Sequence, residues 1–349
     1  MRIAQVCPLH FAVPPRDHGG TERVVGDLTR ALVALGHEVT LYAADGSDTP
    51  ARLRAMGPQV SDLEHLAPGL PAAREAAMLE AVAVEVDDYD VVHCHTEFMH
   101  APVLRTSRAR TLTTVHWRLD QADRHAFFAA FPDLPVAAIS TDQGRAYTGE
   151  ALVGVVHHGI DRDRFRPGPG GGPVAFLGRM TDQKRPDAAV RVARGAGRPI
   201  RLAGTVDVGN PAYFREKVEP LLGEDAAYVG PVTDAQKQAL LGEASALLFP
   251  VDWPEPFGLV MIEAMACGTP VVARRRGSVP EVIEEGMTGY TFETEEEAVE
   301  ALRLAARLDR ALVRERFEAR FTATRMAEGY EAIYQELTGH PAAGGSVLA

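Results

Sequence analysis

Short apolar runs with strand character alternate with helical patterns along almost the whole chain. Parallel strands that are buried on both faces read as continuous apolar runs, and each needs a crossover connection before the next strand. The alternation therefore predicts a doubly wound α/β fold with mainly parallel sheets and helices on both faces. The expected strands are Ile3–Cys7, Glu38–Tyr42, Val91–Cys94, Thr111–Val115, Val136–Ile139, Val153–Val156, Val174–Leu177, Ile200–Ala203, Ala226–Val229, Ala246–Phe249, Pro270–Val272 and Tyr290–Phe292. The expected helices are Gly20–Leu35, Pro71–Val86, Thr141–Thr148, Pro186–Ala196, Ala212–Leu222, Asp234–Ala244, Gly258–Ala266, Val279–Glu284 and Glu295–Thr338, the last as one helix throughout.

A Gly- and Pro-rich segment, RPGPGGGP at Arg166–Pro173, interrupts this alternation. No core helix or strand tolerates such a run, and a chain of 349 residues can bury two cores, so the segment marks a domain boundary. The expected organisation is an N-terminal domain over 1–166, a hinge-like linker over 167–173, a second domain over 174–321 and a disordered tail over 339–349. Because ligands of doubly wound sheets bind at the carboxyl ends of strands, we expect a site in a cleft between the two domains.

The charge balance disfavours one class of partner. The net charge is −12, with 16 basic and 22 acidic residues before Pro167 and 20 basic and 26 acidic residues from there on, so each half carries −6. Neither half has the positive charge that binding to nucleic acid requires. Strong electrostatic binding to anionic membranes is disfavoured for the same reason, while peripheral membrane contact stays open.

The cysteines and the lengths of the apolar runs indicate the cellular compartment of the protein. Cys7, Cys94 and Cys267 are odd in number and lie in or beside apolar runs, which indicates reduced thiols of a cytoplasmic protein. No run approaches the roughly 18 apolar residues that span a bilayer. The first residues, MRIAQVCPL, are expected to form a strand and not a signal peptide.

Two carboxylates stand eight positions apart in the stretch Trp253–Val272, WPEPFGLVMIEAMACGTPVV. Pro254 and Pro256 hold the first of them, Glu255, in a loop, because proline is poor in a helix interior. Glu263 is the only charge in the apolar helix that follows, and a buried carboxylate needs hydrogen-bond donors. The hydroxyls of a sugar would supply such donors, and so would a neighbouring Arg.

Two cations follow another expected strand. The segment Phe176–Lys184, FLGRMTDQK, ends a strand at Gly178 and presents Arg179 and Lys184 five residues apart. This arrangement suits a diphosphate, although a solvated basic loop would look the same. Lys184 is one of only three lysines among 36 basic residues, which favours a chemical role.

Glycines and a histidine mark two further strand ends. Gly19 and Gly20 precede an expected helix, whose first amides can bind an anion, although an ordinary βα turn looks the same. Glu22, just after them, would cap that helix or face a substrate. His116 follows the strand Thr111–Val115, where a lone histidine is more often structural, although its expected position at the cleft favours a function.

A cluster of histidines and a cysteine raises the question of a metal. In a strand, His93 and His95 lie on one face and Cys94 on the other, so the three cannot easily bind one ion, and no metal site is expected. The roles of His93, His95 and His158 stay open.

Together these motifs resemble the retaining glycosyltransferases of family 4. Glu255, Phe257, Gly258 and Glu263 match the E-x7-E signature of that family; Gly19, Gly20, Thr21 and Glu22 match its glycine loop; Arg179 and Lys184 match its diphosphate-holding pair; and His116 matches its histidine near the donor sugar. His158 stands where the family usually has Asn. The resemblance runs in family order from the first βα loop to the segment Thr288–Phe292, and the glycine-containing loop Gly277–Ile283 supports it.

The resemblance implies the GT-B fold, in which two Rossmann-like doubly wound domains face each other across a cleft. The N-terminal domain would bind the acceptor and the second domain the nucleotide-sugar donor. The last helix, expected over 322–338, would cross back and pack on the N-terminal domain.

The activity that the resemblance implies is that of a hexosyltransferase without metal or cofactor. It would move a hexose from a nucleotide sugar, with a UDP-sugar preferred, to a hydroxyl of a small-molecule, saccharide or lipid-linked acceptor by a same-face displacement. Glu255 would hold hydroxyls of the donor sugar and Glu263 those of the ribose, in a monomer or homodimer. Catalysis would fall to Glu255, His116, Arg179 and Lys184, and donor binding to Gly19, Gly20, Gly178, Arg179, Lys184, Phe257, Gly258, Leu259, Val260 and Glu263.

Other functions fit the same architecture. A nucleotide-sugar epimerase and a non-catalytic nucleotide-sugar-binding subunit are the alternatives, whereas an NAD-dependent dehydrogenase would need a G-x-G-x-x-G motif that does not follow the first strand. The acceptor is not identified. Trp117, Phe127, Phe128 and Phe131 would line an apolar acceptor wall or belong to a helix that packs on the sheet.

Overall fold

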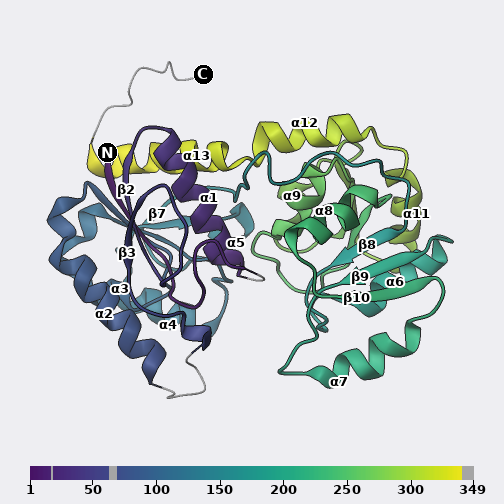
Figure 1. The fold of residues 1–349 in the computed structure, drawn as a ribbon, viewed down its shortest axis with the longest axis horizontal. Helices are drawn as coiled ribbons and strands as arrows, with labels where there is room; N and C mark the ends of the chain where they lie inside the picture. The colour runs from purple at the N-terminus through teal and green to yellow at the C-terminus, as the bar shows by residue number, and fades with distance from the viewer. Residues whose placement is uncertain (17–18, 63–68, 340–349) are drawn as a thin grey trace. The chain divides into compact units, whose positions relative to one another are not determined.

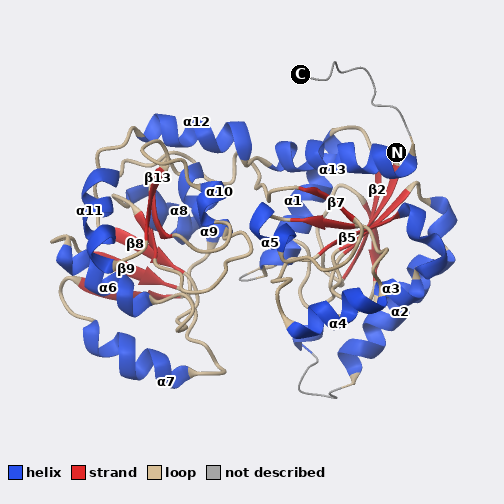
Figure 2. Cartoon of the chain, turned by 180° about the vertical axis from the view of Figure 1, so that it is seen from behind, coloured by secondary structure: helices blue, strands red, loops and turns tan. Residues whose placement is uncertain are grey.

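The chain forms two compact units in a computed structural model that describes residues 1–16, 19–62 and 69–339. The first unit consists of Met1–Gly159 together with helix α13 (Ala323–Thr338), and the second unit of Ile160–Thr322. Each unit has one parallel sheet with helices on both faces (Figures 1 and 2), which confirms the predicted α/β class. Asp17, His18 and the expected tail beyond residue 339 lie outside the described residues.

The first unit is built on a parallel sheet of seven strands. Its strands are β1 (Arg2–Val6), β2 (Glu38–Ala43), β3 (Arg52–Ala55), β4 (Val91–Cys94), β5 (Thr111–Thr114), β6 (Val136–Ala138) and β7 (Leu152–Val155), and its helices, besides α13, are α1 (Gly20–Ala34), α2 (Leu70–Val84), α3 (His100–Val103), α4 (Ala122–Ala130) and α5 (Thr141–Arg145). The strand order is β3-β2-β1-β4-β5-β6-β7. Helices α1 and α13 lie side by side over one face, and α2, α3 and α4 over the other (Figures 1 and 2).

Polar side chains are buried in the central strands of this sheet. β1, β4 and β5 are covered on both faces, so apolar residues are expected throughout, yet Gln5, His93 and Thr114 are each 0% exposed. A buried polar group costs free energy unless it is hydrogen-bonded, so these three side chains require partners within the unit.

The second unit repeats the plan with six parallel strands. Its strands are β8 (Val174–Leu177), β9 (Ile200–Ala203), β10 (Ala226–Gly230), β11 (Leu247–Phe249), β12 (Val271–Arg274) and β13 (Gly289–Phe292), and its helices are α6 (Pro186–Gly195), α7 (Pro211–Tyr213), α8 (Asp234–Glu243), α9 (Leu259–Ala266), α10 (Val279–Val282), α11 (Glu295–Ala305) and α12 (Arg310–Arg320). The order is β10-β9-β8-β11-β12-β13. Helices α6 and α11 pack on one face, while α8, α9 and α12 pack on the other (Figure 2).

The Gly- and Pro-rich segment does not separate the units. Gly168 donates its backbone N–H to the carbonyl of Cys267 (3.1 Å), and Gly170 donates to Gly242 (2.9 Å). A Cβ on Gly168 would lie 2.4 Å from the backbone of Gly242, so the absence of a side chain allows this close approach. The segment expected as a hinge over 167–173 therefore belongs to the second unit, and the chain passes between the units at Gly159–Ile160 and Thr322–Ala323.

The single helix predicted over Glu295–Thr338 is wrong. The structure has three helices there, α11, α12 and α13. Asp309 caps α12, because its side chain accepts a hydrogen bond from the N–H of Ala311 (2.9 Å). At the second break, the carbonyl of Phe321 accepts from the N–H of Ile160 (3.0 Å), a tertiary contact that the helical pattern does not reveal.

Several short elements were not predicted. β3 is an edge strand with arginines at two of its four positions, which removes the apolar signal of a strand. α4 lies in a segment that the sequence left unassigned. Phe128 of α4 is 0% exposed and packs with Val115 and Val136, and Phe127 of the same helix packs against this cluster. Trp117 and Phe131 pack against the cluster from outside the helix, so two of the four aromatic residues belong to a helix that packs on the sheet.

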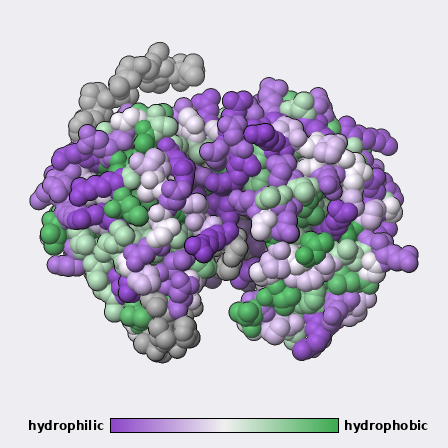
Figure 3. Space-filling view, viewed as in Figure 1, coloured by the Kyte–Doolittle hydropathy of each residue, from purple (hydrophilic) through white to green (hydrophobic). Residues whose placement is uncertain are grey.

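The surface has a mixed character. Figure 3 shows hydrophilic side chains spread among apolar ones on the face that it displays. Within residues 1–16, 19–62 and 69–339, no helix combines the length and the apolar content that crossing a membrane requires.

Candidate functional site

Glu255 is a buried carboxylate with two donors. It lies in the loop between β11 and α9 and is 7% exposed. Its Oε2 accepts hydrogen bonds from the indole Nε1 of Trp253 (2.7 Å) and from the ammonium of Lys184. Lys184 Nζ also lies 5.1 Å from the ring centroid of Phe249 and 5.2 Å from that of Trp253. The carboxylate, the ammonium and two aromatic faces thus form one cluster.

The neighbouring loop holds the backbone of Glu255 in place. Gly277 has φ of +57°, and a Cβ there would lie 2.3 Å from the carbonyl oxygen of Glu255. Ser278 donates its backbone N–H to that carbonyl (3.0 Å) and its hydroxyl to the carbonyl of Phe257 (2.8 Å). The segment predicted as a supporting loop, Gly277–Ile283, therefore fixes the course of the chain on both sides of Pro256.

The two predicted cations have different environments. At the end of β8, Gly178 donates its N–H to Ala203 (3.0 Å), which keeps the strand paired up to the turn. The turn then closes where Lys184 donates its N–H to the carbonyl of Thr181 (3.2 Å). Lys184 points to Glu255, whereas Arg179 is exposed and has no ion-pair partner within the described part of the chain.

Glu263 is buried in α9 and is likewise paired with a lysine. It is 4% exposed, and its Oε1 accepts from Nζ of Lys237 on α8 at 2.7 Å. Lys237 Nζ lies 5.7 Å from the ring centroid of Phe165. The partner of this carboxylate is therefore a lysine and not the arginine that was considered. Both carboxylates of the E-x7-E stretch have a lysine partner, and these are two of the three lysines of the chain.

The start of α9 lies between the two carboxylates. Gly258 precedes the helix with φ of +82°, and Phe257 is buried at 2% exposure. The first amides of an α-helix have no intrahelical acceptor, and in α9 they belong to the half-buried Leu259 and Val260. These donors and the positive end of the helix dipole suit an anion.

A hollow of about 520 Å³ lies in the first unit at the start of α1. Gly20, Thr21 and Glu22 line it together with two further carboxylates, Glu75 and Glu97, and with apolar side chains of Phe11, Phe98 and Met99. Gly19 caps α1 with φ of +137°, and a Cβ there would lie 2.9 Å from the carboxylate of Glu22. Burial raises the pKa of Glu22, although backbone hydrogen bonds from Glu22 and Phe11 oppose this shift. Glu22 therefore both binds backbone amides and faces the hollow.

His116 lies between His95 and His158 in a chain of hydrogen-bonded histidines in the first unit. It is half-buried just after β5, and its Nε2 lies 2.9 Å from Nδ1 of His95, while its Nδ1 lies 3.3 Å from Nε2 of His158. Burial lowers the pKa of His116 to about 3. Burial holds the pKa values of His93, His95 and His158 well below the ordinary range, and repulsion from neighbouring imidazoles is the second, smaller cause. These rings are therefore neutral at physiological pH.

The strand geometry predicted for the β4 histidines is confirmed. The rings of His93 and His95 share one face, with centroids 4.1 Å apart, while Cys94 packs in the apolar cluster on the other side. Both rings are held by side-chain hydrogen bonds within the unit.

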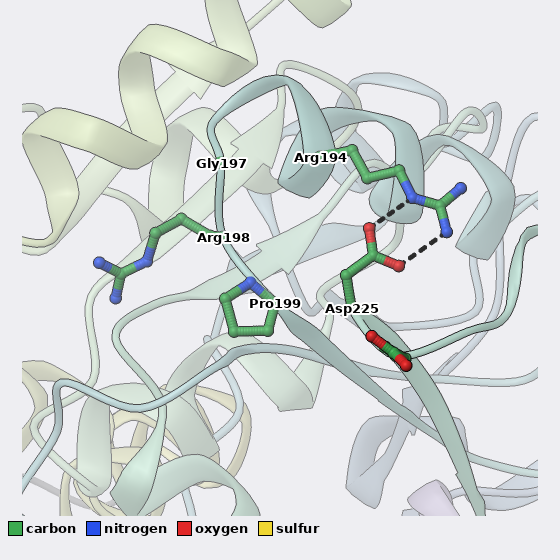
Figure 4. A pocket seen from close by; sticks show the side chains of 6 residues that line it. Arg194, Gly197, Arg198, Pro199 and Asp225 are labelled. Carbon is green, nitrogen blue, oxygen red and sulfur yellow. Dashed lines mark hydrogen bonds and ion pairs between the residues drawn. The ribbon is translucent and has the colours of Figure 1, made fainter.

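A second hollow, of about 430 Å³, lies in the second unit away from these residues. Figure 4 shows Arg194 and Asp225 on its wall, where the guanidinium donates to both carboxylate oxygens at 2.6 and 2.8 Å. The pair neutralises its own charge, and no residue of the predicted site lines the hollow. We assign it no function.

Four residues that contact the site residues were not predicted from the sequence. Trp253 and Lys237 hydrogen-bond to the two carboxylates, and Gln5 and Tyr334 hydrogen-bond to His95 and His93. The rarity of lysine was the one signal available for Lys237, which otherwise looks like a solvent-facing helix residue. Gln5 and Tyr334 are separated by 329 positions and meet only in the fold.

Comparisons with known proteins identify the class and then the family. The model of Glycosyltransferase Family 4 matches residues 18–164, and that of Glycosyl transferases group 1 matches residues 161–322. The chain is 27% identical over 355 residues to phosphatidyl-myo-inositol mannosyltransferase of Mycobacterium leprae, covering 91% of this chain and 90% of that protein. Two Rossmann-like units with these matches define a glycosyltransferase of the GT-B fold.

Solved structures agree with this fold. Sucrose-phosphate synthase from Thermosynechococcus elongatus superposes with a TM-score of 0.76 at 21% identity, covering 98% of this chain and 100% of that one. The Anabaena protein HepE in complex with UDP and glucose gives a TM-score of 0.70 at 18% identity, covering 96% and 100%. The chain belongs to glycosyltransferase family 4, as its motifs predicted.

The histidine distribution predicts that the first unit loses stability in mild acid before the second. A buried histidine with a lowered folded-state pKa binds its proton more readily when unfolded, so its contribution is present above the unfolded pKa and is lost as pH falls. Five such side chains, His93, His95, His100, His116 and His158, would remove about 6 kcal/mol between about pH 7 and pH 5.5. Burial raises the pKa values of Glu22 and Glu75, which act in the opposite sense but are fewer.

Hydrogen exchange measured peptide by peptide across this pH range tests the prediction. Residues 160–322 contain none of the twelve histidines, so the second unit is the internal control. We expect protection to fall first in the first unit. Simultaneous loss in both units, or earlier loss in the second, would contradict the assignment of the buried neutral histidines.

Proposed function

We propose that this glycosyltransferase is a retaining, metal-independent hexosyltransferase that uses a nucleotide sugar, with a UDP-hexose as the first donor to test. The proposal rests on one observation: α9 and the loop before it present two buried carboxylates, Glu255 and Glu263, each paired with a lysine. A buried ion pair gives little net stability, because desolvation offsets its attraction. A role in binding or catalysis therefore explains the burial of these charges better than a contribution to stability does.

Lys184 is proposed to change partner when the donor binds. A diphosphate carries more negative charge than one carboxylate and binds ammonium groups strongly. Its arrival would draw Lys184 away from Glu255, with the exposed Arg179 and the first amides of α9 as further donors. Oxygens of Glu255 would then be available to hydroxyls of the donor sugar.

Glu263 is proposed to bind the ribose of the nucleotide. Lys237 occupies its Oε1, but a carboxylate has two oxygens and about four acceptor positions. Vicinal ribose hydroxyls can therefore still donate to it. Lys237 would keep the carboxylate oriented before the nucleotide binds.

The proposed reaction is a same-face displacement. The bond between the anomeric carbon and the leaving phosphate oxygen breaks, and the bond to the acceptor oxygen forms on the same face. The proton of the acceptor hydroxyl passes to the departing diphosphate, so the step needs no separate base on the protein. Lys184, Arg179 and the helix dipole would stabilise the charge that develops on the diphosphate, and Glu255 the positive charge that develops on the sugar.

The acceptor is proposed to bind in the hollow at the start of α1. Glu22, Glu75 and Glu97 can accept hydrogen bonds from several hydroxyls, and Phe98 and Met99 offer an apolar wall for a ring. A polyhydroxylated ring, of the kind that the name of the mycobacterial relative includes, fits this chemistry. For His116 we propose the role that its place after β5 has in the family, contact with the donor sugar.

A transfer assay tests the proposed reaction. The protein is incubated with UDP-glucose and a panel of polyols and saccharides in excess EDTA, and the anomeric configuration of the product is read by NMR. We expect release of UDP and an α-linked product. A β-linked product, a requirement for metal, or conversion of the nucleotide sugar without acceptor would each contradict the proposal, the last in favour of an epimerase.

Two isosteric variants of one stretch test the division of roles. Glu255→Gln should lower kcat about a hundredfold with UDP affinity retained, because its charge acts in the transition state. Glu263→Gln should weaken UDP binding about tenfold or more, because hydrogen bonds to a charged group are worth about 1.5–3 kcal/mol. Calorimetry and steady-state kinetics measure both, with thermal unfolding as the control for folding. The reverse pattern, or equal effects, would refute the assignment.

A further inference from the structure

The buried histidines of the first unit belong to one continuous chain of hydrogen bonds that ends on α13. From His116 the chain passes through His95, whose Nε2 lies 2.8 Å from Oε1 of Gln5, and Nε2 of Gln5 donates to the hydroxyl of Tyr334 at 3.1 Å. Tyr334 Oη lies 2.7 Å from Nδ1 of His93. Every link is within the first unit, and every side chain from His95 to Tyr334 is buried.

The orientation of the Gln5 amide sets the direction of this chain. The amide oxygen only accepts and the amide nitrogen only donates. Because Oε1 of Gln5 accepts from His95, the proton of the neutral His95 ring is on Nε2, and its Nδ1 must accept. His116 then carries its proton on Nε2 and donates it to His95, and its Nδ1 accepts from Nε2 of His158.

His93, His95 and His116 each use both ring nitrogens in the chain, so these rings cannot change tautomer one at a time. Reversing His95 alone would place a donor against a donor on one side and an acceptor against an acceptor on the other. The whole chain from His158 to Gln5 therefore has only two self-consistent arrangements, related by a flip of the Gln5 amide. The Tyr334 hydroxyl accepts from Gln5 and donates to His93, whose Nε2 then donates to Oγ1 of Thr114 at 2.8 Å.

We propose that Gln5 and Tyr334 are positioning residues, which fix the tautomer and orientation of His116 through His95. Helix α13 thereby sets the hydrogen-bonding state of a histidine to which it has no direct link in the chain. The predicted effect on the rate of sugar transfer rests on the proposed function, because it requires that His116 contact the donor sugar. The predicted effect on the His116 tautomer is independent of that function.

The α13 helix supplies a matched pair of variants. Tyr334 and Tyr330 are both 0% exposed, but among the described residues the hydroxyl of Tyr330 meets only Thr114 Oγ1 (3.0 Å), on the branch beyond His93. Tyr334→Phe removes the group that anchors the Gln5 amide, whereas Tyr330→Phe makes the same chemical change off the path to His116. Gln5→Met, of similar shape, removes both amide groups and serves as a second test.

Nitrogen-15 NMR of the histidine side chains, with kcat measured in parallel, tests the inference in the full-length protein. In the wild type and Tyr330→Phe we expect one tautomer of His116, with the proton on Nε2. In Tyr334→Phe and Gln5→Met we expect a mixture of tautomers and a kcat lowered about tenfold, the scale found when groups that orient a functional histidine are lost.

An unchanged tautomer in Tyr334→Phe and Gln5→Met would overturn the inference. Equal effects of Tyr334→Phe and Tyr330→Phe would overturn it too, because they would show that α13 acts on His116 through packing and not through the hydrogen-bond chain. A shifted tautomer in a protein that transfers no sugar would support the hydrogen-bond chain and count against the proposed function alone.

Discussion

The second unit depends on the pairing of two buried carboxylates with two lysines. Glu255 and Glu263 are 7% and 4% exposed, and an isolated charge at such a depth would destabilise the fold. Lys184 comes from the turn after β8 and Lys237 from α8, so one pair connects the loop before α9 to that turn and the other connects α9 to α8. Gly277 and Ser278 complete the support, because they fix the backbone on which Glu255 stands.

Under the proposed function, these pairs account for a site that is both stable and reactive. Each lysine pairs with a carboxylate in the free protein, and in the proposal it is shared with, or released to, an anionic ligand. The aromatic faces of Phe249 and Trp253 lower the cost of holding the Lys184 ammonium out of water. An apolar pair of the same shape could be as stable, but it would offer a nucleotide sugar nothing to bind.

The sequence predicted most strands, the family and the carboxylates, because those features depend on local pattern. Continuous apolar runs marked β8 and β11, and the spacing of Glu255 and Glu263 marked the motif. The failures were of another kind. The helix predicted over Glu295–Thr338 is broken by a cap at Asp309 and by the tertiary contact of Phe321 with Ile160. The Gly- and Pro-rich segment was predicted as a linker from its composition, but its glycines allow backbone to pack on backbone.

The partners of the site residues could not be predicted because they come from distant positions. Lys184 and Glu255 are 71 positions apart, and Gln5 and Tyr334 are 329 apart. Such pairs follow from the order of strands in the sheets, which the alternation of elements does not specify. The buried histidines illustrate the limit: their shared face was predictable from the period of a strand, but the path from His95 through Gln5 to α13 was not.

The most direct test of the account is a calorimetric titration with UDP, GDP, ADP, dTDP and NAD in the absence of metal, on the wild type and on Lys184→Ala. The account predicts that one nucleoside diphosphate binds the wild type and that Lys184→Ala weakens this binding, because the ammonium paired with Glu255 is the group that meets the diphosphate. Binding of NAD alone, or equal nucleotide affinity in the two proteins, would contradict it.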